Sequence, residues 1–365
     1  MAFINKLCID GYRGIRQLKI GELKQVNLVV GDNNCGKTSV LEALQLLRTS
    51  GNLANVYRVA RQRDSIALLG SNSIFDNFIC MFPKNNGGKL EIRVSGTCDD
   101  KEISFFLEGR QSRVLLDTRE LLFRKYRQQD MPDGEIETEA FDGTISLKLD
   151  DIDKKTEIHV NQYSSVTGTP FSDKGQINIV YLSPFDHLRG SNLSKILRNE
   201  SYKQICIKAL QLFDPDIEDM MIFKSDIGNR PVEYIRHRLL GDMPVSSYGD
   251  GIKKVLALSN GIAMAAGGIL LIDEIETAIH KKYYDDIFRF IVKACRSFKV
   301  QAFITTHSIE AIDGLLGTQD YGAQREVDDI CVCTIKSTKG GSVSRVLSGR
   351  EVYENREAFG FEVRL

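Results

Sequence analysis

The stretch that decides the fold is GDNNCGKT, residues 31–38. It fits the pattern G-x-x-x-x-G-K-[ST], in which the backbone N–H groups of a glycine-rich loop surround phosphates. In this pattern a lysine, here Lys37, reaches the outer phosphates, and a hydroxyl, here that of Thr38, holds Mg²⁺. The sequence therefore predicts a nucleotide-binding protein with ATP and Mg²⁺ as cofactors.

The residues on either side supply the context that such a loop requires. Residues 25–30 are expected to form a strand that runs directly into the loop. Apolar residues then recur at helical spacing, at Val40, Leu41, Leu44 and Leu47. The order strand, glycine-rich loop, helix is that of a phosphate-binding loop. We expect its contacts with ATP to come from Gly31, Asn33, Asn34, Cys35, Gly36, Lys37, Thr38 and Ser39.

An apolar run at residues 269–272 ends in two acids, Asp273 and Glu274. A buried strand of this form can deliver one carboxylate, Asp273, to Mg²⁺ and the next, Glu274, to a water in line with the terminal phosphate. The plainer alternative is a core strand that enters a turn. Because the phosphate loop precedes this run and His307 follows it, the catalytic interpretation is favoured.

Two further segments complete a set of four. The first is SSYGDG, residues 246–251, which precedes an apolar helical pattern at 252–266. A glycine-rich loop at a helix N-terminus presents free N–H groups to an anion, although serine and glycine together also make ordinary turns. The second is TTHS, residues 305–308, at the end of an expected strand, where His307 is either a ligand-contacting residue or an ordinary half-exposed histidine.

In this order the four segments resemble those of ABC-type ATPases. The resemblance implies an α/β fold, an ABC-type P-loop NTPase head with a mixed central sheet, an antiparallel β subdomain and a helical subdomain. It also implies that ATP binds between two copies of the chain and that His307 is the switch histidine at the γ-phosphate. The signature-loop residues that would meet this phosphate from the opposite copy are Ser247, Gly249 and Gly251. Glu276 and His280 would lie where a partner segment crosses, or else are a helix-start charge and a structural histidine.

Hydrophobic periodicity organises the chain into one ATPase domain over residues 1–365. An N-terminal lobe, 1–116, would hold the phosphate loop and antiparallel strands; a charged lid or insertion, 117–142, follows; and a C-terminal lobe, 143–365, would hold the signature loop, Asp273 and His307. The expected strands are 4–9, 25–30, short runs within 88–116, 145–149, 157–160, 176–182, 269–273 and 299–305, and the expected helices are 193–213, 252–266 and 283–297. The alternation after residue 252 is α/β order with parallel strands.

Composition limits the classes of function. Hydrophobic residues make up 42% of the 365, enough for a full core, and 48 basic side chains nearly balance 49 acidic ones, so no global field indicates nucleic acid. The eight cysteines form no C-x-x-C pair, which argues against a disulfide framework or a zinc site. With no signal-like start and no apolar run of membrane-spanning length, we expect a cytoplasmic protein without membrane contact.

More of the chain is similar to the standalone OLD-like AAA ATPases of prokaryotes, which share the ABC head with SMC proteins. The similar segments are IDGYRGI at 9–15, the loop at 31–39, GDG at 249–251, LIDEIE at 271–276 with His280, and TTHS at 305–308. The resemblance implies that Arg13 lies near the phosphates, although a surface arginine after a strand is the alternative. The 58 residues after His307 are too few for a Toprim nuclease domain, so we expect an ATPase whose effector is separately encoded.

Three functions remain open at this stage. The first is a homodimeric or larger ATPase that controls a separately encoded nuclease or toxin in defence against phage, as the resemblance implies. The second is an SMC-like DNA-binding ATPase in repair, for which the interleaved basic and aromatic residues of 119–127 are the best support, with a solvated helical lid as the alternative. The third is a scaffold that binds ATP for assembly without hydrolysing it.

Overall fold

The computed structural model describes residues 3–48, 52–64, 73–84, 88–98, 101–117, 134–149, 152–164, 177–189, 193–224, 231–321 and 328–364. Its centre is a six-stranded mixed sheet in the order β15-β14-β3-β13-β12-β8. The strands are β3 (Val26–Val30), β8 (Ile179–Leu182), β12 (Ile269–Ile272), β13 (Gln301–Thr305), β14 (Ile330–Thr338) and β15 (Gly341–Ser348). Only β15 runs antiparallel to its neighbour, so the other five strands end at the same edge.

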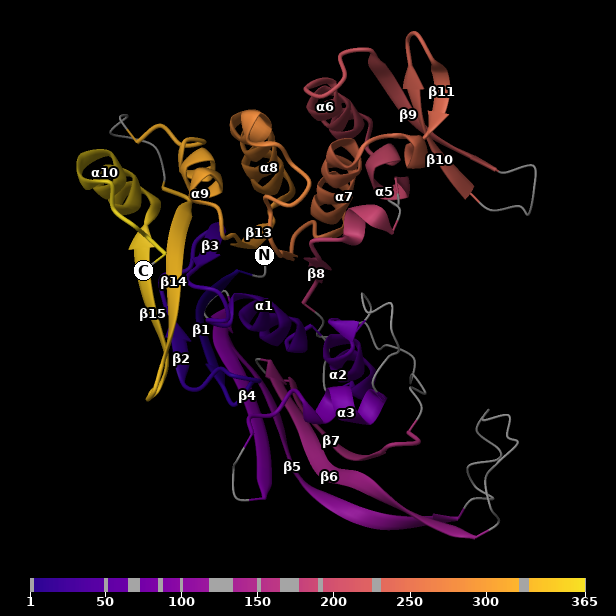
Figure 1. The fold of residues 1–365 in the computed structure, drawn as a ribbon, viewed down its shortest axis with the longest axis vertical. Helices are drawn as coiled ribbons and strands as arrows, with labels where there is room; N and C mark the ends of the chain where they lie inside the picture. Colours follow the sequence, from indigo (N-terminus) through magenta and orange to yellow (C-terminus); the bar gives the residue numbers. More distant parts are fainter. Residues whose placement is uncertain are drawn as a thin grey trace.

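A second six-stranded sheet is entirely antiparallel, in the order β2-β1-β4-β5-β6-β7. Its strands are β1 (Ile4–Asp10), β2 (Leu18–Ile20), β4 (Lys89–Cys98), β5 (Lys101–Asp117), β6 (Glu135–Leu149) and β7 (Ile152–Asn161). In Figure 1 the far ends of β5 and β6 extend away from the body of the molecule. Helix α1 (Lys37–Leu46) lies between this sheet and the central one. Two further helices, α2 (Leu53–Ala60) and α3 (Ile74–Ile79), lie beside the antiparallel sheet (Figure 1).

Helices cover the opposite face of the central sheet (Figure 1). They are α5 (Ser194–Leu197), α6 (Glu200–Gln211), α7 (Asp250–Met264), α8 (Tyr284–Phe298), α9 (Ile309–Leu316) and α10 (Gly349–Phe359), with short 3-10 turns η2 (Asp186–Leu188), η3 (Val245–Ser247) and η4 (Lys281–Tyr283). A small antiparallel sheet, β11-β10-β9, stands at the end of the α6–α7 pair. Its strands are β9 (Ile217–Lys224), β10 (Pro231–His237) and β11 (Gly241–Pro244).

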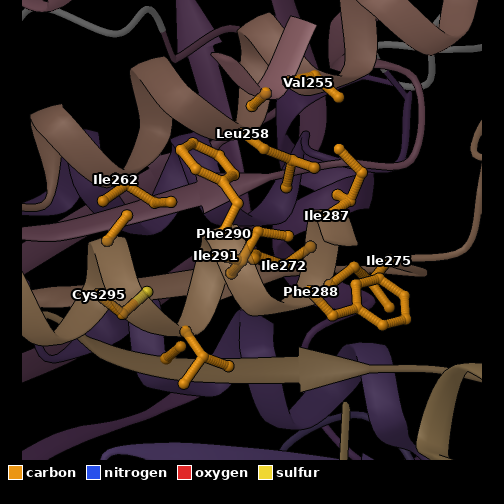
Figure 2. Close-up of a cluster of buried hydrophobic side chains, with 14 of the residues drawn as sticks. Val255, Leu258, Ile262, Ile272, Ile275, Ile287, Phe288, Phe290, Ile291 and Cys295 are labelled. Atoms are coloured by element: carbon orange, nitrogen blue, oxygen red, sulfur yellow. The ribbon is translucent and has the colours of Figure 1, made fainter. Parts of the chain in front are cut away.

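The core has two parts because the central sheet is buried on both faces. Alternate residues of a strand point to opposite faces, so Leu270 and Ile272 of β12 join one cluster while Ile269 and Leu271 join the other. Figure 2 shows the first cluster, in which side chains of α7 and α8 close over Ile272. The three strands β3, β12 and β13 are buried along their whole length, so their ends are held between packed layers on both faces.

The expected α/β class, with its mixed sheet, antiparallel β subdomain and helical subdomain, is confirmed. The strands expected at 269–273 and 299–305 and the helix expected at 283–297 appear as β12, β13 and α8, within about two residues. The antiparallel strands are longer than the short runs expected, and β6 already begins at Glu135, inside the segment expected as a lid. The rest of that segment, 118–133, lies outside the described residues. Among the described helices, none has the length and apolar character that a bilayer crossing needs.

Candidate nucleotide site

Three predicted site segments, and the turn that begins at Ser183, follow four neighbouring parallel strands. The phosphate loop follows β3, Asp273 follows β12, His307 lies two residues after β13, and Ser183 follows β8. Because parallel strands end at one edge of a sheet, these segments meet there, and that edge is where open α/β sheets bind ligands. The topology therefore explains why residues more than 200 positions apart in the sequence share a site.

The phosphate loop has the backbone that only glycine permits at its first position. Gly31 has φ +142°, and a Cβ there would lie 2.2 Å from the carbonyl oxygen of Ile335. Gly36 also has a positive φ, +104°, and leads into α1, whose first residue is Lys37. The Lys37 Nζ donates to the carbonyl oxygens of Gly31 and Asp32, both at 2.8 Å. Burial lowers the pKa of Lys37, while the nearby Cys35 and Asp273 oppose that shift.

Cys35 is packed beneath this loop and is only 5% exposed. Its Sγ lies 3.9 Å from the Lys37 Nζ, and it is the side chain that a Cβ on Gly31 would strike at 2.9 Å. We therefore assign the Cys35 side chain to loop packing, whereas its backbone remains part of the predicted phosphate contact. Ser39, the last residue of the predicted set, is buried, and its Oγ accepts a hydrogen bond from Arg63 at 3.1 Å.

The two predicted Mg²⁺ ligands lie side by side. The Thr38 hydroxyl donates to Asp273 Oδ1 at 3.2 Å, and Asp273 is 4% exposed. Two other hydroxyls hold the same carboxylate: Thr305 donates to Oδ1 at 2.6 Å and Tyr181 donates to Oδ2 at 3.0 Å. Burial, together with the charge of Asp273, raises the pKa of Tyr181, which keeps its phenol protonated as a donor. An oxygen-only set of a carboxylate and a hydroxyl fits Mg²⁺.

Glu274 and His307 face each other across the edge of the sheet. The Glu274 Oε1 lies 3.9 Å from His307 Nε2, and both side chains are about two-fifths exposed, at 44% and 40%. Glu274 has φ +49°, a left-handed conformation that is uncommon for a residue with a side chain. Its N–H donates to the Thr305 hydroxyl at 2.9 Å, which holds the backbone in this conformation. The carboxylate is thereby aimed toward solvent beside the phosphate loop.

Glu276 fixes the histidine segment from within the same chain. Its Oε1 accepts hydrogen bonds from the N–H groups of His307 at 2.7 Å and Ser308 at 3.2 Å. The His280 Nδ1 accepts from the Lys282 N–H and caps η4. These contacts are internal, so the partner crossing predicted for Glu276 and His280 stays a prediction.

Sequence reasoning missed Arg364, which closes one side of the site. The Arg364 Nη1 donates to the carbonyl oxygen of His307 at 2.9 Å, and its other donors form a bidentate pair with Glu362 at 2.7 and 2.8 Å. Both residues line a cavity of about 320 Å³ with His307 and the loop residues 31–33. Arg364 holds the pKa of Glu362 at about 2. A penultimate arginine carries no motif, so the sequence offered no signal for it.

Arg13 does not point freely into the site. Its Nε pairs with the carboxylate of Glu42 at 2.8 Å, and Glu42 is fully buried on α1. Arg63 binds the same carboxylate at 2.7 Å, and the Tyr12 hydroxyl donates to it at 3.2 Å. This network ties Arg13 to the helix that begins at Lys37, while its contact with phosphates stays a prediction.

The signature-loop residues lie on the surface. Ser247 ends η3, Gly249 precedes α7 as its N-terminal cap residue, and Ser247 and Gly249 are exposed. A Cβ on Gly249 would meet nothing within 4 Å, whereas one on Gly251 would lie 2.9 Å from the Phe213 ring. Gly249 is thus open to an approaching molecule, and Gly251 is needed for internal packing. In Figure 1, α7 stands on the opposite side of the central sheet from α1.

Three kinds of comparison place this geometry among known proteins. The chain is 22% identical to "ATP/GTP phosphatase" of Helicobacter pylori over 89% of this chain and 91% of the relative. It is 27% identical to "DNA replication and repair protein RecF" of Oenococcus oeni over 33% of this chain and 31% of the relative. Among solved structures, the Smc head bound to the C-winged helix domain of ScpA has 12% identity and a TM-score of 0.49, with 96% of this chain and 99% of that one covered.

A family model described as "AAA domain, putative AbiEii toxin, Type IV TA system" matches residues 26–313. This match begins at the strand that enters the phosphate loop and ends in α9, after His307. It therefore includes the loop, the acids after β12 and the histidine segment, and it spans well over half of the chain. The chain belongs to this family of AAA domains.

Proposed function

We propose that this chain binds ATP and hydrolyses it with Mg²⁺. The observation that carries the proposal is the convergence of Lys37, Thr38, Asp273, Glu274 and His307 at one edge of the sheet. The name of the Helicobacter pylori relative, "ATP/GTP phosphatase", supports nucleotide hydrolysis as the reaction class. Of the two carboxylates in this set, Asp273 is buried, whereas Glu274 is exposed beside His307. This position suits Glu274 to accept a proton from the attacking water.

The roles of the residues follow from their places. Lys37 and the loop N–H groups bind the phosphates, and Thr38 and Asp273 hold Mg²⁺, which when bound neutralises charge that develops on the phosphates. Thr305 holds Asp273 and Glu274 in position relative to each other, because its hydroxyl donates to the Asp273 carboxylate and accepts from the Glu274 N–H. The backbone of His307 is held by Glu276 and Arg364, and its side chain is the one that we propose contacts the γ-phosphate.

We further propose that the active form is a dimer around ATP. Ser247 and Gly249 precede α7 and are exposed, Gly251 lies in the first turn of α7, and α7 stands on the opposite side of the central sheet from α1 (Figure 1). A loop at the start of a 15-residue helix offers N–H groups to an anion. In the dimer this loop completes the site of the other copy, so one ATP has ligands from two chains.

Turnover is proposed to control a separately encoded effector, a nuclease or toxin, in anti-phage defence. Two observations support this step: the family description names a putative AbiEii toxin and a Type IV TA system, and the resemblance to OLD-like ATPases extends over most of the chain. The partner's identity would be tested by co-purification from the native host.

The test of the reaction uses two variants with opposite expectations. Lys37→Ala should lose ATP binding, because the ammonium supplies charge to the phosphates in the ground state. Glu274→Gln should keep binding but stop phosphate release, because only the attacking water needs the carboxylate. Wild-type turnover by Glu274→Gln would remove Glu274 as the base, and no turnover by the wild type would leave the scaffold function.

The dimer is tested by mixing two inactive proteins. Lys37→Ala and Ser247→Arg each damage both sites of a homodimer. A mixed dimer has one site built from the intact phosphate loop of one chain and the intact signature loop of the other. Mixing should therefore recover ATPase activity. No recovery, together with no crosslink from a cysteine placed at Ser247 to a reactive ATP analogue bound in trans, would refute the shared site.

A second candidate is a DNA-binding ATPase, favoured by the partial similarity to RecF. Its predicted basic segment, 119–127, lies outside the described residues. Binding through phosphates must weaken steeply as salt rises. Replacing Arg124, Lys125 and Arg127 by glutamate should abolish such binding, and a wild type that binds no DNA at low salt, with and without ATP, would exclude it.

A further inference from the structure

A second cavity lies beside the nucleotide site and has no part in the reaction described above. Its volume is about 530 Å³, within the range of about 300 to 1,000 Å³ usual for small-molecule sites. One wall is formed by α1 and α2, and the other by the end of β8 and the turn after it (Figure 1). Tyr181 belongs to both places, because it lines this cavity while its hydroxyl bonds Asp273.

Positive charge collects on the α2 wall. Arg58 and Arg61 line the cavity three residues apart, so they share one side of the helix end. Arg58 donates to the amide oxygen of Asn55 at 2.9 Å, and neither arginine has a carboxylate partner within the part of the chain that the structure describes. Part of Arg58 is open to solvent, yet burial by the protein around it lowers its pKa to about 10, and the charge of Arg48 adds to that shift. Among the described residues, therefore, no carboxylate pairs with these like charges.

The acids of the cavity are already engaged and do not supply a counterion. Asp64 accepts a hydrogen bond from the side-chain amide of Asn77. Across the cavity, Asp186 accepts from the Ser183 N–H at 2.7 Å and pairs with Arg189 at 3.4 Å. The hydroxyl of Ser183, which is 8% exposed, has no hydrogen-bond partner among the described residues. Among the described residues, donors without an acidic partner therefore lie on both walls: the guanidinium groups of Arg58 and Arg61 on one and the Ser183 hydroxyl on the other.

We propose that this cavity binds a small phosphorylated ligand through Arg58 and Arg61. Guanidinium groups bind phosphate by paired hydrogen bonds, and two of them on one helix end match a single phosphate or diphosphate. Four other lining residues provide amide and aromatic surface for the body of the ligand, namely Gln45, Gln62, Tyr57 and Tyr181. Binding here does not depend on hydrolysis at the nucleotide site.

Calorimetric titration with inorganic pyrophosphate, without Mg²⁺, tests the site. The titrated protein is Lys37→Ala, which silences the phosphate loop. Pyrophosphate should bind this protein, and adding Arg58→Gln and Arg61→Gln should weaken binding by about tenfold or more, since each removes a charge-assisted hydrogen bond. No binding by Lys37→Ala, or binding that the two glutamines leave unchanged, would overturn the proposal.

Arginine labelling locates the ligand independently. Phenylglyoxal modification, mapped by mass spectrometry, should slow at Arg58 and Arg61 when pyrophosphate is present, in wild type and Lys37→Ala alike. Arg113 on β5, whose side chain is 71% exposed, is the matched control and should be labelled at the same rate throughout. AMP should also protect Arg58. Protection by a single-stranded oligonucleotide but not by AMP would refute a small ligand and indicate a nucleic-acid backbone.

Discussion

Replacing Thr305 by valine is expected to cost both stability and turnover. Thr305 is 1% exposed at the end of β13. Its hydroxyl donates to Asp273 at 2.6 Å and accepts from the Glu274 N–H at 2.9 Å, so one oxygen anchors the predicted metal ligand and the predicted base. Valine keeps nearly the same shape, and the change therefore removes two hydrogen bonds with little change in packing.

The size of the loss follows from the two bonds. A hydrogen bond to a charged group contributes about 1.5–3 kcal/mol net, and an N–H left without an acceptor costs about 1 kcal/mol more. We expect the free energy of unfolding to fall by about 2.5–4 kcal/mol. Once released, Glu274 can leave its left-handed conformation, and a displacement of about 1 Å at a catalytic group can lower the rate about 100-fold.

Thr138→Val is the matched control. Thr138 lies on β6, is 4% exposed, and donates to a neutral oxygen, that of Gln162, at 2.9 Å. It should lose only about 1 kcal/mol and keep wild-type turnover. The measurements are urea unfolding and phosphate release at saturating ATP. The reasoning is refuted if Thr305→Val hydrolyses ATP at the wild-type rate, or if it is no less stable than Thr138→Val.

Two further substitutions probe charges near the site. Burial lowers the pKa of Lys254 from 10.5 to about 8, so the unfolded chain binds more protons than the folded one between these values and stability should rise with pH across that window. In Lys254→Met this rise should flatten, as measured by urea unfolding at pH 8 and pH 10.5. If the variant gains as much stability between these two pH values as the wild type does, another group causes the rise. Arg364→Gln should lower kcat/KM for ATP about tenfold, because a charge-assisted hydrogen bond to the His307 carbonyl is lost; an unchanged kcat/KM would restrict Arg364 to a role in holding the C-terminal segment.

The elements that the sequence predicted well are those with a strong local pattern. The apolar run of β12 and the amphipathic pattern of α8 depend on burial, which the residue types reveal directly. The small sheet of β9, β10 and β11 was not expected. Residues 220–223 of β9 are four apolar residues in succession, and Phe223 is 44% exposed. Without alternation of apolar and polar residues, the strand has no period of two to detect.

The same distinction applies to the candidate site. Residues within motifs were identified because each motif is local: the loop at 31–38, Asp273 with Glu274, and His307. Tyr181 and Arg364 were missed because their contacts join positions 92 and 57 residues apart. A tyrosine in a strand, or an arginine near a chain end, has the same appearance in the sequence whether or not it reaches the site. Only the folded arrangement of β8, β12 and the C-terminal segment brings them there.

The hydrogen bonds at the sheet edge also bear on where the proposed turnover would be controlled. Thr305 of β13 holds Asp273 and Glu274 after β12, while Glu276 after β12 holds the backbone of His307 after β13. The two strand ends are thus joined by hydrogen bonds in both directions, which fix the predicted metal ligand, the backbone of the predicted base and the histidine segment relative to one another. Moving any one of them alone would break these hydrogen bonds. We therefore expect control at the step that brings the exposed signature loop of a second copy to the phosphates, which the mixing experiment measures directly.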